Sequence, residues 1–343
     1  MFVPVRSAAE LSRQPPDEPG VLTHTYRRTL RPFHRIFFRT KIRSIYQEML
    51  RSIDVSQFEL IHAHTLYSDG AVALRLQKRF NIPYVVAVRN TDLNVFTRFR
   101  PDLRWIAHAT LREASRVVFL SPAYRKQFLS RLDRPLREEV ERKSIVLANG
   151  LNSFWLETFS RPTRGSGSQL RILYVGQFSD NKNLHNVLRA TALIARRTPV
   201  ELTLVGGGGA GDGHIRKAIA TERYPFARIH GRVDDPVELR SLYRDHDVFV
   251  MPSFKETFGV AYIEALSQGL PIVHSRGQGV DGFFPPGTVS EAVDPSSIDS
   301  IAKGIESLAS RLERVRPVCV REARNFSWDS IALRYKELYS GIG

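Results

Sequence analysis

Two glutamates eight positions apart, Glu256 and Glu264, are the side chains in this sequence best placed to do chemistry. An ionised carboxylate only accepts hydrogen bonds, and this suits it to bind the hydroxyl groups of a sugar or a ribose. Between them, Thr257-Phe258-Gly259-Val260 contains a glycine that would let a ligand approach the backbone closely. The spacing therefore predicts a site for a polar, hydroxyl-rich ligand.

The elements on either side of these residues predict where the site lies. Asp247–Met251 is a short apolar run typical of a buried parallel strand, and the apolar residues from Ala261 to Leu266 predict a helix that Gly269 and Pro271 end. The residues between this strand and this helix would lie at the C-terminal edge of a sheet and at a helix N-terminus. Such a place offers backbone N–H groups and a positive dipole end, which suit a phosphate.

Other candidates follow three further strands predicted in the second half of the chain, because ligands of doubly wound sheets bind beyond the C-terminal ends of the strands. The strands of this half are predicted at 171–175, 201–205, 227–230, 247–251, 271–274 and 291–293. The candidates after them are Gln177, Lys182, Gly206, Gly207 and Val233.

The Glu-x7-Glu spacing, with Pro-Ser before it and Phe-Gly after the first glutamate, resembles the signature of the retaining GT-B glycosyltransferases of the GT4 family. The resemblance covers roughly residues 55–343. It implies that Glu256 contacts the transferred sugar and that Glu264 holds the ribose of the nucleotide. The amides of Phe258, Gly259 and Val260 would meet the sugar or the diphosphate. An amphipathic helix with two solvated glutamates is the alternative interpretation.

The resemblance also implies an α/β fold of the GT-B type, with two Rossmann-like doubly wound parallel-sheet domains facing a central cleft. The implied activity is retaining transfer of a sugar from a nucleotide-diphosphate sugar to a glycan or lipid-linked glycan, without a protein nucleophile, a metal or a cofactor. Lys182 matches the lysine that neutralises the donor phosphates. Its usual arginine partner is replaced by Gln177, which donates hydrogen bonds but cannot form an ion pair.

The family suggests a role in assembling a surface polysaccharide such as capsule, O-antigen or exopolysaccharide. Two other functions stay open. The chain could be a non-catalytic subunit that binds a nucleotide sugar or a glycan, which the glutamine at position 177 favours. It could also be a sugar-nucleotide epimerase on the same scaffold.

Three parts are predicted along the chain: an acceptor domain at 1–158, a donor domain at 159–326, and a helix at 327–343 that crosses back to the acceptor domain. A linker rich in Ser, Thr, Gly and Arg is expected at 160–168. Nothing in residues 1–54 matches the strand and Gly-rich loop that normally open the family's first domain. Residues 1–20 predict a loop instead, and 29–53 a helix.

In the first half, His64, Asn90 and Asp92 are acceptor-side candidates, and Arg89 is a catalytic one. Arg89 stands where many family members have a histidine, and it could steady the departing phosphate or an acidic acceptor. A surface salt bridge between Arg89 and Asp92 is the alternative. His62 and His64 could bind a metal together, but the sequence offers no carboxylate or cysteine set to complete the site. These histidines are therefore expected in the core or lining the cleft.

Two other motifs in this sequence compete with this interpretation. Residues 206–211 satisfy the dinucleotide pattern G-x-G-x-x-G with Asp234 downstream, although N-capping of a helix explains Asp234-Asp235 better. Asp245-His246-Asp247 is a D-x-D sequence typical of some metal sites. It comes before a predicted strand, at the edge away from the ligand, so a helix-exit turn is expected there.

Positive charge is concentrated in the first half, with 26 Lys+Arg against 14 Asp+Glu in residues 1–150 and 24 against 21 in residues 151–343. Basic and apolar residues alternate between Arg27 and Arg43, which predicts an amphipathic segment at an anionic membrane surface. A solvated surface is the alternative, and no nucleic-acid-binding module is found. With one cysteine and no apolar run near 18 residues, a cytoplasmic protein is expected, peripheral at the inner face of the plasma membrane.

Overall fold

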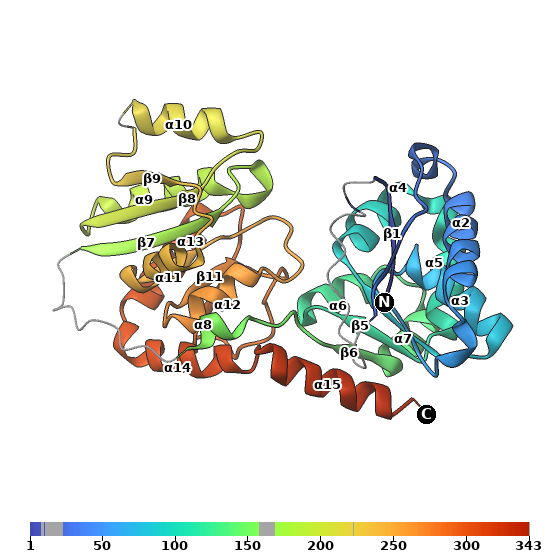
Figure 1. Ribbon diagram of the computed structural model, residues 1–343. Coiled ribbons are helices and arrows are strands. Elements are labelled where there is room, and N and C mark those ends of the chain that lie inside the picture. Colours follow the sequence, from blue (N-terminus) through green and yellow to red (C-terminus); the bar gives the residue numbers. More distant parts are fainter. Residues whose placement is uncertain (8–9, 11–22, 158–168, 222, 343) are drawn as a thin grey trace. The chain divides into compact units, whose positions relative to one another are not determined.

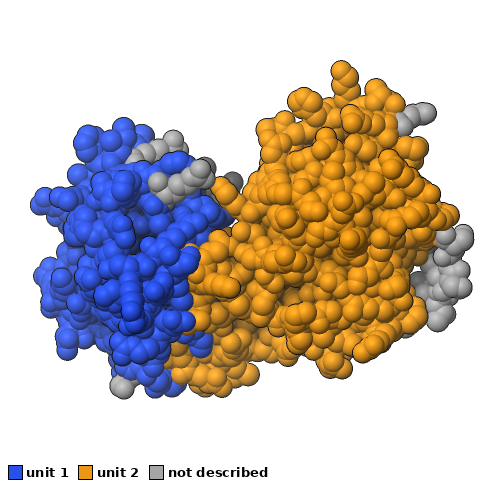
Figure 2. All heavy atoms as spheres, turned by 180° about the vertical axis from the view of Figure 1, so that it is seen from behind, with its two compact units in different colours: residues 1–119, 129–145, 339–343 blue, residues 120–128, 146–338 orange. Residues whose placement is uncertain are grey.

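The computed structural model describes residues 1–7, 10, 23–157, 169–221 and 223–342, and it divides into two compact units (Figure 1). Figure 2 colours unit 1 blue and unit 2 orange. Unit 1 comprises Met1–Phe119, Leu129–Ile145 and Tyr339–Gly343, and unit 2 comprises Leu120–Phe128 and Val146–Leu338. The linker expected at 160–168 lies outside the described residues.

Unit 1 is built on a four-stranded sheet whose strands lie side by side in chain order. They are β3 (Ile61–Ala63), β4 (Tyr84–Val88), β5 (Arg116–Phe119) and β6 (Ser144–Val146). β4 pairs parallel with β3 and with β5, and all its residues are buried, as expected for a strand covered on both faces. In the described part of this unit, the α-helices of ten or more residues are α2 (Phe38–Ser52), α3 (Asp69–Phe80), α5 (Arg104–Glu113) and α7 (Arg134–Lys143).

The start of the chain differs from the prediction. Phe2–Val5 forms strand β1, where a loop was predicted, and it pairs parallel with β2 (Thr25–Arg28) in a separate two-stranded sheet. The helix predicted over 29–53 begins only at Phe38. The residues before it form a separate 3-10 turn, η1 (Pro32–Arg35), because Pro32 favours the first position of a helical turn and starts a new one there.

Unit 2 contains a six-stranded parallel sheet in the order β12-β11-β10-β7-β8-β9. The strands are β7 (Leu170–Gly176), β8 (Val200–Gly206), β9 (Ala227–Gly231), β10 (Val248–Val250), β11 (Ile272–Ser275) and β12 (Ser290–Val293). The strand order reverses between the neighbours β7 and β10. Loops that leave such a switch point diverge and open a crevice at the C-terminal edge of the sheet, where ligands bind.

Helices accompany the strands of this sheet as the alternating pattern predicts (Figure 1). They are α8 (Ser153–Leu156), α9 (Leu184–Ala195), α10 (Asp212–Ala220), α11 (Pro236–Asp245), α12 (Val260–Ser267), α13 (Ile298–Ala309), α14 (Leu312–Arg324) and α15 (Trp328–Ser340). Helix α6 (Pro122–Leu129) follows β5 of the four-stranded sheet instead. Helix α13 packs against α9, and α12 packs against α14. Buried side chains of these elements form one apolar core, and burial of each large aliphatic or aromatic side chain stabilises the fold by about 1.5–3 kcal/mol.

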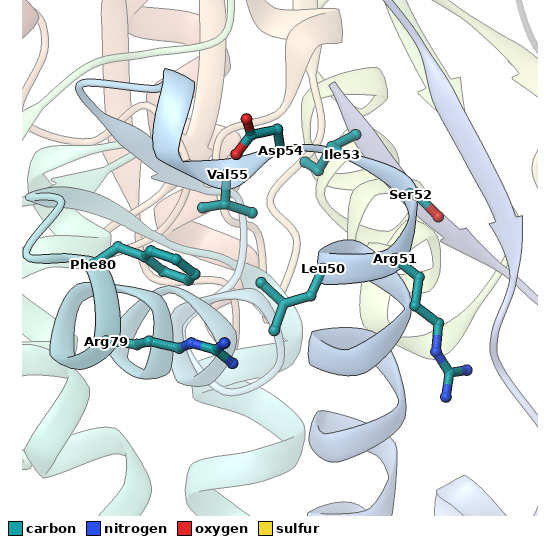
Figure 3. A pocket seen from close by; sticks show the side chains of 8 residues that line it. All are labelled: Leu50, Arg51, Ser52, Ile53, Asp54, Val55, Arg79 and Phe80. Carbon is teal, nitrogen blue, oxygen red and sulfur yellow. The ribbon is translucent and has the colours of Figure 1, made fainter.

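Figure 3 shows a surface hollow in unit 1 that lies at the wrong end of the sheet for a ligand site. It is lined by the last residues of α2, the last residues of α3 and the segment Ile53–Val55. These helix ends lead into the strands, so they mark the N-terminal edge of the sheet, whereas ligands bind at the C-terminal edge. In the part of the chain that the structure describes, no helix is both long and apolar enough to cross a membrane.

Candidate functional site

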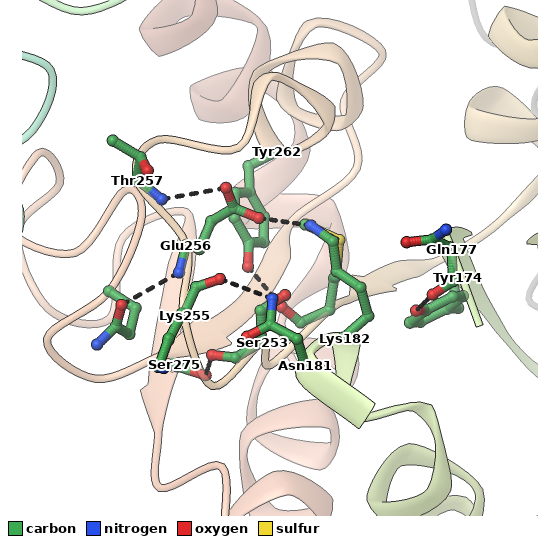
Figure 4. Close-up of polar contacts among 12 residues, drawn as sticks. Tyr174, Gln177, Asn181, Lys182, Ser253, Lys255, Glu256, Thr257, Tyr262 and Ser275 are labelled. Carbon is green, nitrogen blue, oxygen red and sulfur yellow. Dashed lines mark hydrogen bonds and ion pairs between the residues drawn. The ribbon is translucent and has the colours of Figure 1, made fainter. Parts of the chain in front are cut away.

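The centre of the candidate site is an ion pair between the loops that leave β7 and β10. Lys182 Nζ lies 2.6 Å from Glu256 Oε2, with 25% and 15% of the two side chains exposed (Figure 4). Lys182 ends the 3-10 turn η5 (Asp180–Lys182) after β7, and Glu256 follows β10. Because β7 and β10 are neighbouring parallel strands, the sequence places both residues at the switch point of the sheet.

The Glu256 loop is fixed by hydrogen bonds from neighbouring loops. The Glu256 amide donates to Gln278 Oε1 at 3.1 Å, and its carbonyl accepts from the Gly279 amide at 2.8 Å. Asn181 Nδ2 donates to the Lys255 carbonyl at 3.0 Å (Figure 4). The carboxylate of Glu256 is thereby held against Lys182 by a loop with little freedom, which is the preorganisation that a binding site needs.

A glycine at a left-handed backbone angle links this loop to helix α12. Gly259 is the N-cap of α12 with φ of 80°, and a Cβ there would lie 2.6 Å from the Tyr262 ring. Only glycine fits this turn without strain. Gly259 has no side chain to cap the first amides of α12, so the helix N-terminus beside Glu256 is suited to an anion.

Glu264 has a different partner from Glu256. Tyr243 Oη donates to Glu264 Oε2 at 3.1 Å, and Tyr243 is fully buried against Trp155 and Phe249. Burial raises the pKa of the Glu264 carboxyl, and the hydrogen bond from Tyr243 lowers it. The second glutamate of the motif is therefore anchored to α11 through a rigid aromatic side chain.

The glycine loop after β8 approaches β7 closely. A Cβ on Gly206 would lie 2.1 Å from the Gly176 carbonyl oxygen, and φ is 125° there. The Gly208 amide donates to Asp212 Oδ1 at 3.0 Å. Glycine is therefore required at position 206 by the close contact between the ends of β7 and β8, whether or not a ligand binds.

One of the two acidic residues expected to cap a helix does so. Asp235 accepts from the Val237 amide at 2.9 Å at the start of α11, which confirms N-capping for Asp235, whereas Asp234 pairs with Arg232 at 2.8 Å. Asp245 ends α11 and Asp247 precedes β10, which confirms the predicted helix-exit turn. Asp247 pairs with Arg316 at 2.7 Å.

The remaining donor-side candidates have contrasting surroundings. Gln177 is exposed and lies apart from the Lys182–Glu256 pair (Figure 4). Val233 is half-buried against the core, and Val260 is exposed at the start of α12. The Phe258 ring is buried against Phe283 and Phe326, so only its backbone is offered to a ligand.

In unit 1 the candidate Asp92 is enclosed by backbone donors. Its side chain is fully buried, and the carboxylate accepts from the amides of Arg89 at 2.8 Å, Leu66 at 3.1 Å and Tyr67 at 3.4 Å. A surface salt bridge does not describe it, because a carboxylate enclosed by backbone donors does not face solvent, and its part in acceptor binding stays a prediction. Burial raises the pKa of Asp92 to about 6, against the effect of those hydrogen bonds. Asp92 instead fixes the loops after β3 and β4.

The other first-unit candidates remain on or near the surface. His64 and Asn90 are exposed, and Arg89 Nε donates to the His64 carbonyl at 3.3 Å. His62 stacks on His64 with ring centroids 4.5 Å apart, and its Nδ1 lies 2.7 Å from Tyr339 Oη. Burial, followed by the charges of His64 and Arg89, lowers the pKa of His62 to about 4. In the described part of the chain, no group of three His, Cys, Asp or Glu residues could hold a metal ion.

Several residues that shape the site were missed from the sequence. Asn181 and Gln278 both follow strands of the second sheet, so a search of all strand-end loops for amide side chains would have found them. Ser121 is fully buried and donates to the Thr257 carbonyl at 3.0 Å. Lys41 Nζ donates to Ser68 Oγ at 2.7 Å, a contact between segments 27 residues apart that no sequence pattern predicts.

Comparison with known proteins gives a consistent result over most of the chain. A model described as glycosyl transferases group 1 matches residues 157–325, and a glycosyl transferase 4-like domain matches residues 3–140. An uncharacterized glycosyltransferase of Methanocaldococcus jannaschii is 26% identical over 90% of this chain and 83% of its own length.

Two solved structures resemble the chain closely in fold. Sucrose-phosphate synthase of Thermosynechococcus elongatus superposes with a TM-score of 0.71 at 21% identity, over 100% of this chain and 88% of the other. HepE of Anabaena, in complex with UDP, superposes with a TM-score of 0.70 at 17% identity, over 93% of this chain and 86% of the other. These likenesses confirm the predicted fold class.

Proposed function

Because this chain belongs to the group 1, GT4-like glycosyltransferases, we propose that it is a retaining enzyme that moves a sugar from a nucleotide-diphosphate sugar to an acceptor without a metal. The observation that carries the proposal is the Lys182–Glu256 pair beside the N-terminus of α12. A cation, a carboxylate and a helix N-terminus at one switch point match the charges of a diphosphate and the hydroxyls of a sugar.

Each residue has a role in the proposed reaction. The bond from the anomeric carbon to the phosphate oxygen breaks while a bond to the acceptor oxygen forms on the same face, and the acceptor proton passes to the departing phosphate. Lys182 and the amides of α12 stabilise the charge that develops on that phosphate. Glu256 orients the sugar through its hydroxyls, and Glu264 holds the ribose. The rate comes from positioning and electrostatics, without a covalent intermediate.

The acceptor in this proposal is a glycan or a lipid-linked glycan in the assembly of a surface polysaccharide. The excess of basic residues in the first half supports an anionic acceptor such as a lipid diphosphate. Arg89 is its candidate contact, with His64 and Asn90 beside it. Asp92 acts as a positioning residue, because it accepts from the Arg89 amide.

The first experiment is calorimetry of the chain and of Glu264→Ala with UDP, GDP and ADP in the presence of EDTA. Binding of one nucleotide, weakened by the substitution, supports a metal-independent donor site and identifies the base. Absence of binding to all three would overturn the proposal.

Product analysis then separates the three candidate activities. A glycosylated acceptor or hydrolysed donor with retained anomeric configuration supports the transferase. An altered sugar nucleotide with no glycosylated product would assign an epimerase. Binding without turnover would assign a non-catalytic subunit, an outcome that Gln177 favours because the usual arginine is absent there.

A further inference from the structure

Large apolar side chains are exposed on two segments of unit 1 that are distant in sequence. Among the described residues, thirteen large hydrophobic side chains are exposed, and six of them lie between residues 33 and 37 or between 95 and 105. Ile36 is 72% exposed and Phe99 64%. Exposed hydrophobic residues scattered singly are ordinary, but a group of this kind marks an interaction site.

Direct contacts join the two segments into one face. The rings of Phe38 and Phe96 meet at 5.2 Å, and the Arg39 guanidinium lies 5.2 Å from the centre of the Trp105 ring. Arg100 approaches the Phe38 ring at 5.9 Å. The start of α2 therefore lies against α4 (Thr97–Phe99) and the start of α5 (Figure 1). We call Phe33, Ile36, Phe37, Val95, Phe99 and Trp105, with the arginines among them, the aromatic–arginine face.

The charge around these side chains is strongly positive. Residues 31–43 and 95–105 together contain eight Lys or Arg and a single acidic residue, Asp102. Asp102 is already paired with Arg100 at 2.7 Å. Arg31, Arg39 and Arg43 are exposed. Protruding aromatic and aliphatic side chains among an excess of positive charge are complementary to an anionic bilayer surface, where rings enter the headgroup region and arginines meet phosphates.

We propose that the aromatic–arginine face docks unit 1 on the surface of an anionic phospholipid bilayer. The face continues along the chain from the loop after β4, which carries the acceptor candidates Arg89 and Asn90. In so far as the proposed function holds, docking there would bring a lipid-linked acceptor within reach of that loop. The docking itself depends only on the surface and is independent of catalysis.

Vesicle binding by the full chain tests this proposal. We expect co-sedimentation with vesicles of equal parts phosphatidylcholine and phosphatidylglycerol, weakened by salt, and binding at least about tenfold weaker to phosphatidylcholine alone. The triple variant Ile36→Ser/Phe37→Ser/Phe99→Ser and the double variant Arg39→Glu/Arg43→Glu should each lower the partition coefficient by at least about tenfold. The matched control Val237→Ser/Leu333→Ser removes two apolar side chains of unit 2 that are also more than half exposed, and it should bind as the parent does.

Several outcomes would overturn the proposal: no vesicle binding, equal binding to both vesicle types, or unchanged binding of both face variants. Binding of a polyglutamate peptide or a DNA oligomer in place of vesicles would assign the face to an acidic macromolecule. Circular dichroism melts confirm that the variants fold. Because nucleotide calorimetry is measured separately, a failure of docking is distinguishable from a failure of the proposed function.

Discussion

Lys182 Nζ and Glu256 Oε2 lie 2.6 Å apart across the loops that leave two neighbouring strands, so each charge is held in place by the other. Such a pair adds little stability, because both side chains are partly exposed and an ion pair of this kind contributes about 0–1 kcal/mol. In the proposed reaction, the pair would hold the lysine cation at the point where the diphosphate leaves.

Lys182→Met is therefore expected to reduce sugar transfer far more than stability. Removing the cation should lower kcat by about 100- to 1,000-fold and weaken binding of the nucleoside diphosphate by about tenfold or more. Steady-state kinetics and calorimetry measure both effects. Lys255→Met is the matched control, because Lys255 is exposed and adjacent to Glu256. A Lys182→Met protein with parental turnover would exclude Lys182 from the reaction.

Gly259→Ala should weaken both the fold and the donor site. The new Cβ would meet the Tyr262 ring at 2.6 Å at a φ of 80°. The matched control is Gly208→Ala, with φ of 70° and nothing within 4 Å of the new Cβ. Both variants carry a backbone cost of about 1–3 kcal/mol, so their difference in free energy of unfolding reports the contact with Tyr262. Equal destabilisation would show that Tyr262 simply moves aside.

Asp92→Asn should destabilise unit 1, because the amide group of asparagine cannot accept from all three backbone donors that Asp92 now satisfies. We expect the free energy of unfolding to fall by about 1–3 kcal/mol. Urea denaturation measures this change. If Asp92 positions the loop after β4, acceptor KM should also rise in a variant that still binds nucleotide normally. A normal acceptor KM would remove its positioning role.

The same carboxylate predicts a pH dependence. The folded pKa of Asp92 is about 6, above its ordinary value of 3.8, so the folded state binds the proton more tightly between these values. Stability from this group is fully present below pH 4 and is lost as pH rises through 6. The difference in unfolding free energy between the parent chain and Asp92→Asn should shrink over that window and stay constant above it. A difference that grows with pH would contradict the burial of this carboxyl.

The sequence predicted unit 2 more completely than unit 1 for physical reasons. The central strands β7, β8, β10 and β11 are mostly apolar runs between glycine, proline or charged turns, which is a strong signal for buried parallel strands. By contrast, β1 and β2 are four-residue strands in which Val5 alone is buried, and their composition carries little signal. At position 92, burial depends on which backbone donors the folded loops bring together. Residue type and spacing therefore singled out Asp92 but did not predict that its carboxylate is buried among backbone donors.

The last prediction separates the two glutamates of the motif. If Glu264 holds the ribose, Glu264→Gln should lower affinity for the nucleoside diphosphate and remove its discrimination against the 2′- and 3′-deoxy analogues. Losing a hydrogen bond to a charged acceptor should cost about 1.5–3 kcal/mol of binding. Tyr243→Phe should have a smaller effect of the same kind, because Tyr243 Oη lies 3.1 Å from Glu264 Oε2 and acts by orienting it.

Glu256→Gln provides the matched comparison for Glu264→Gln. It should leave nucleotide discrimination intact and instead lower turnover, because Glu256 is proposed to contact the sugar. Calorimetry with the parent and deoxy nucleotides resolves the two patterns, and a double variant of Tyr243 and Glu264 should show strong non-additivity. If both glutamate variants lose discrimination alike, the two carboxylates share one ligand group, and the division of roles between sugar and ribose is wrong.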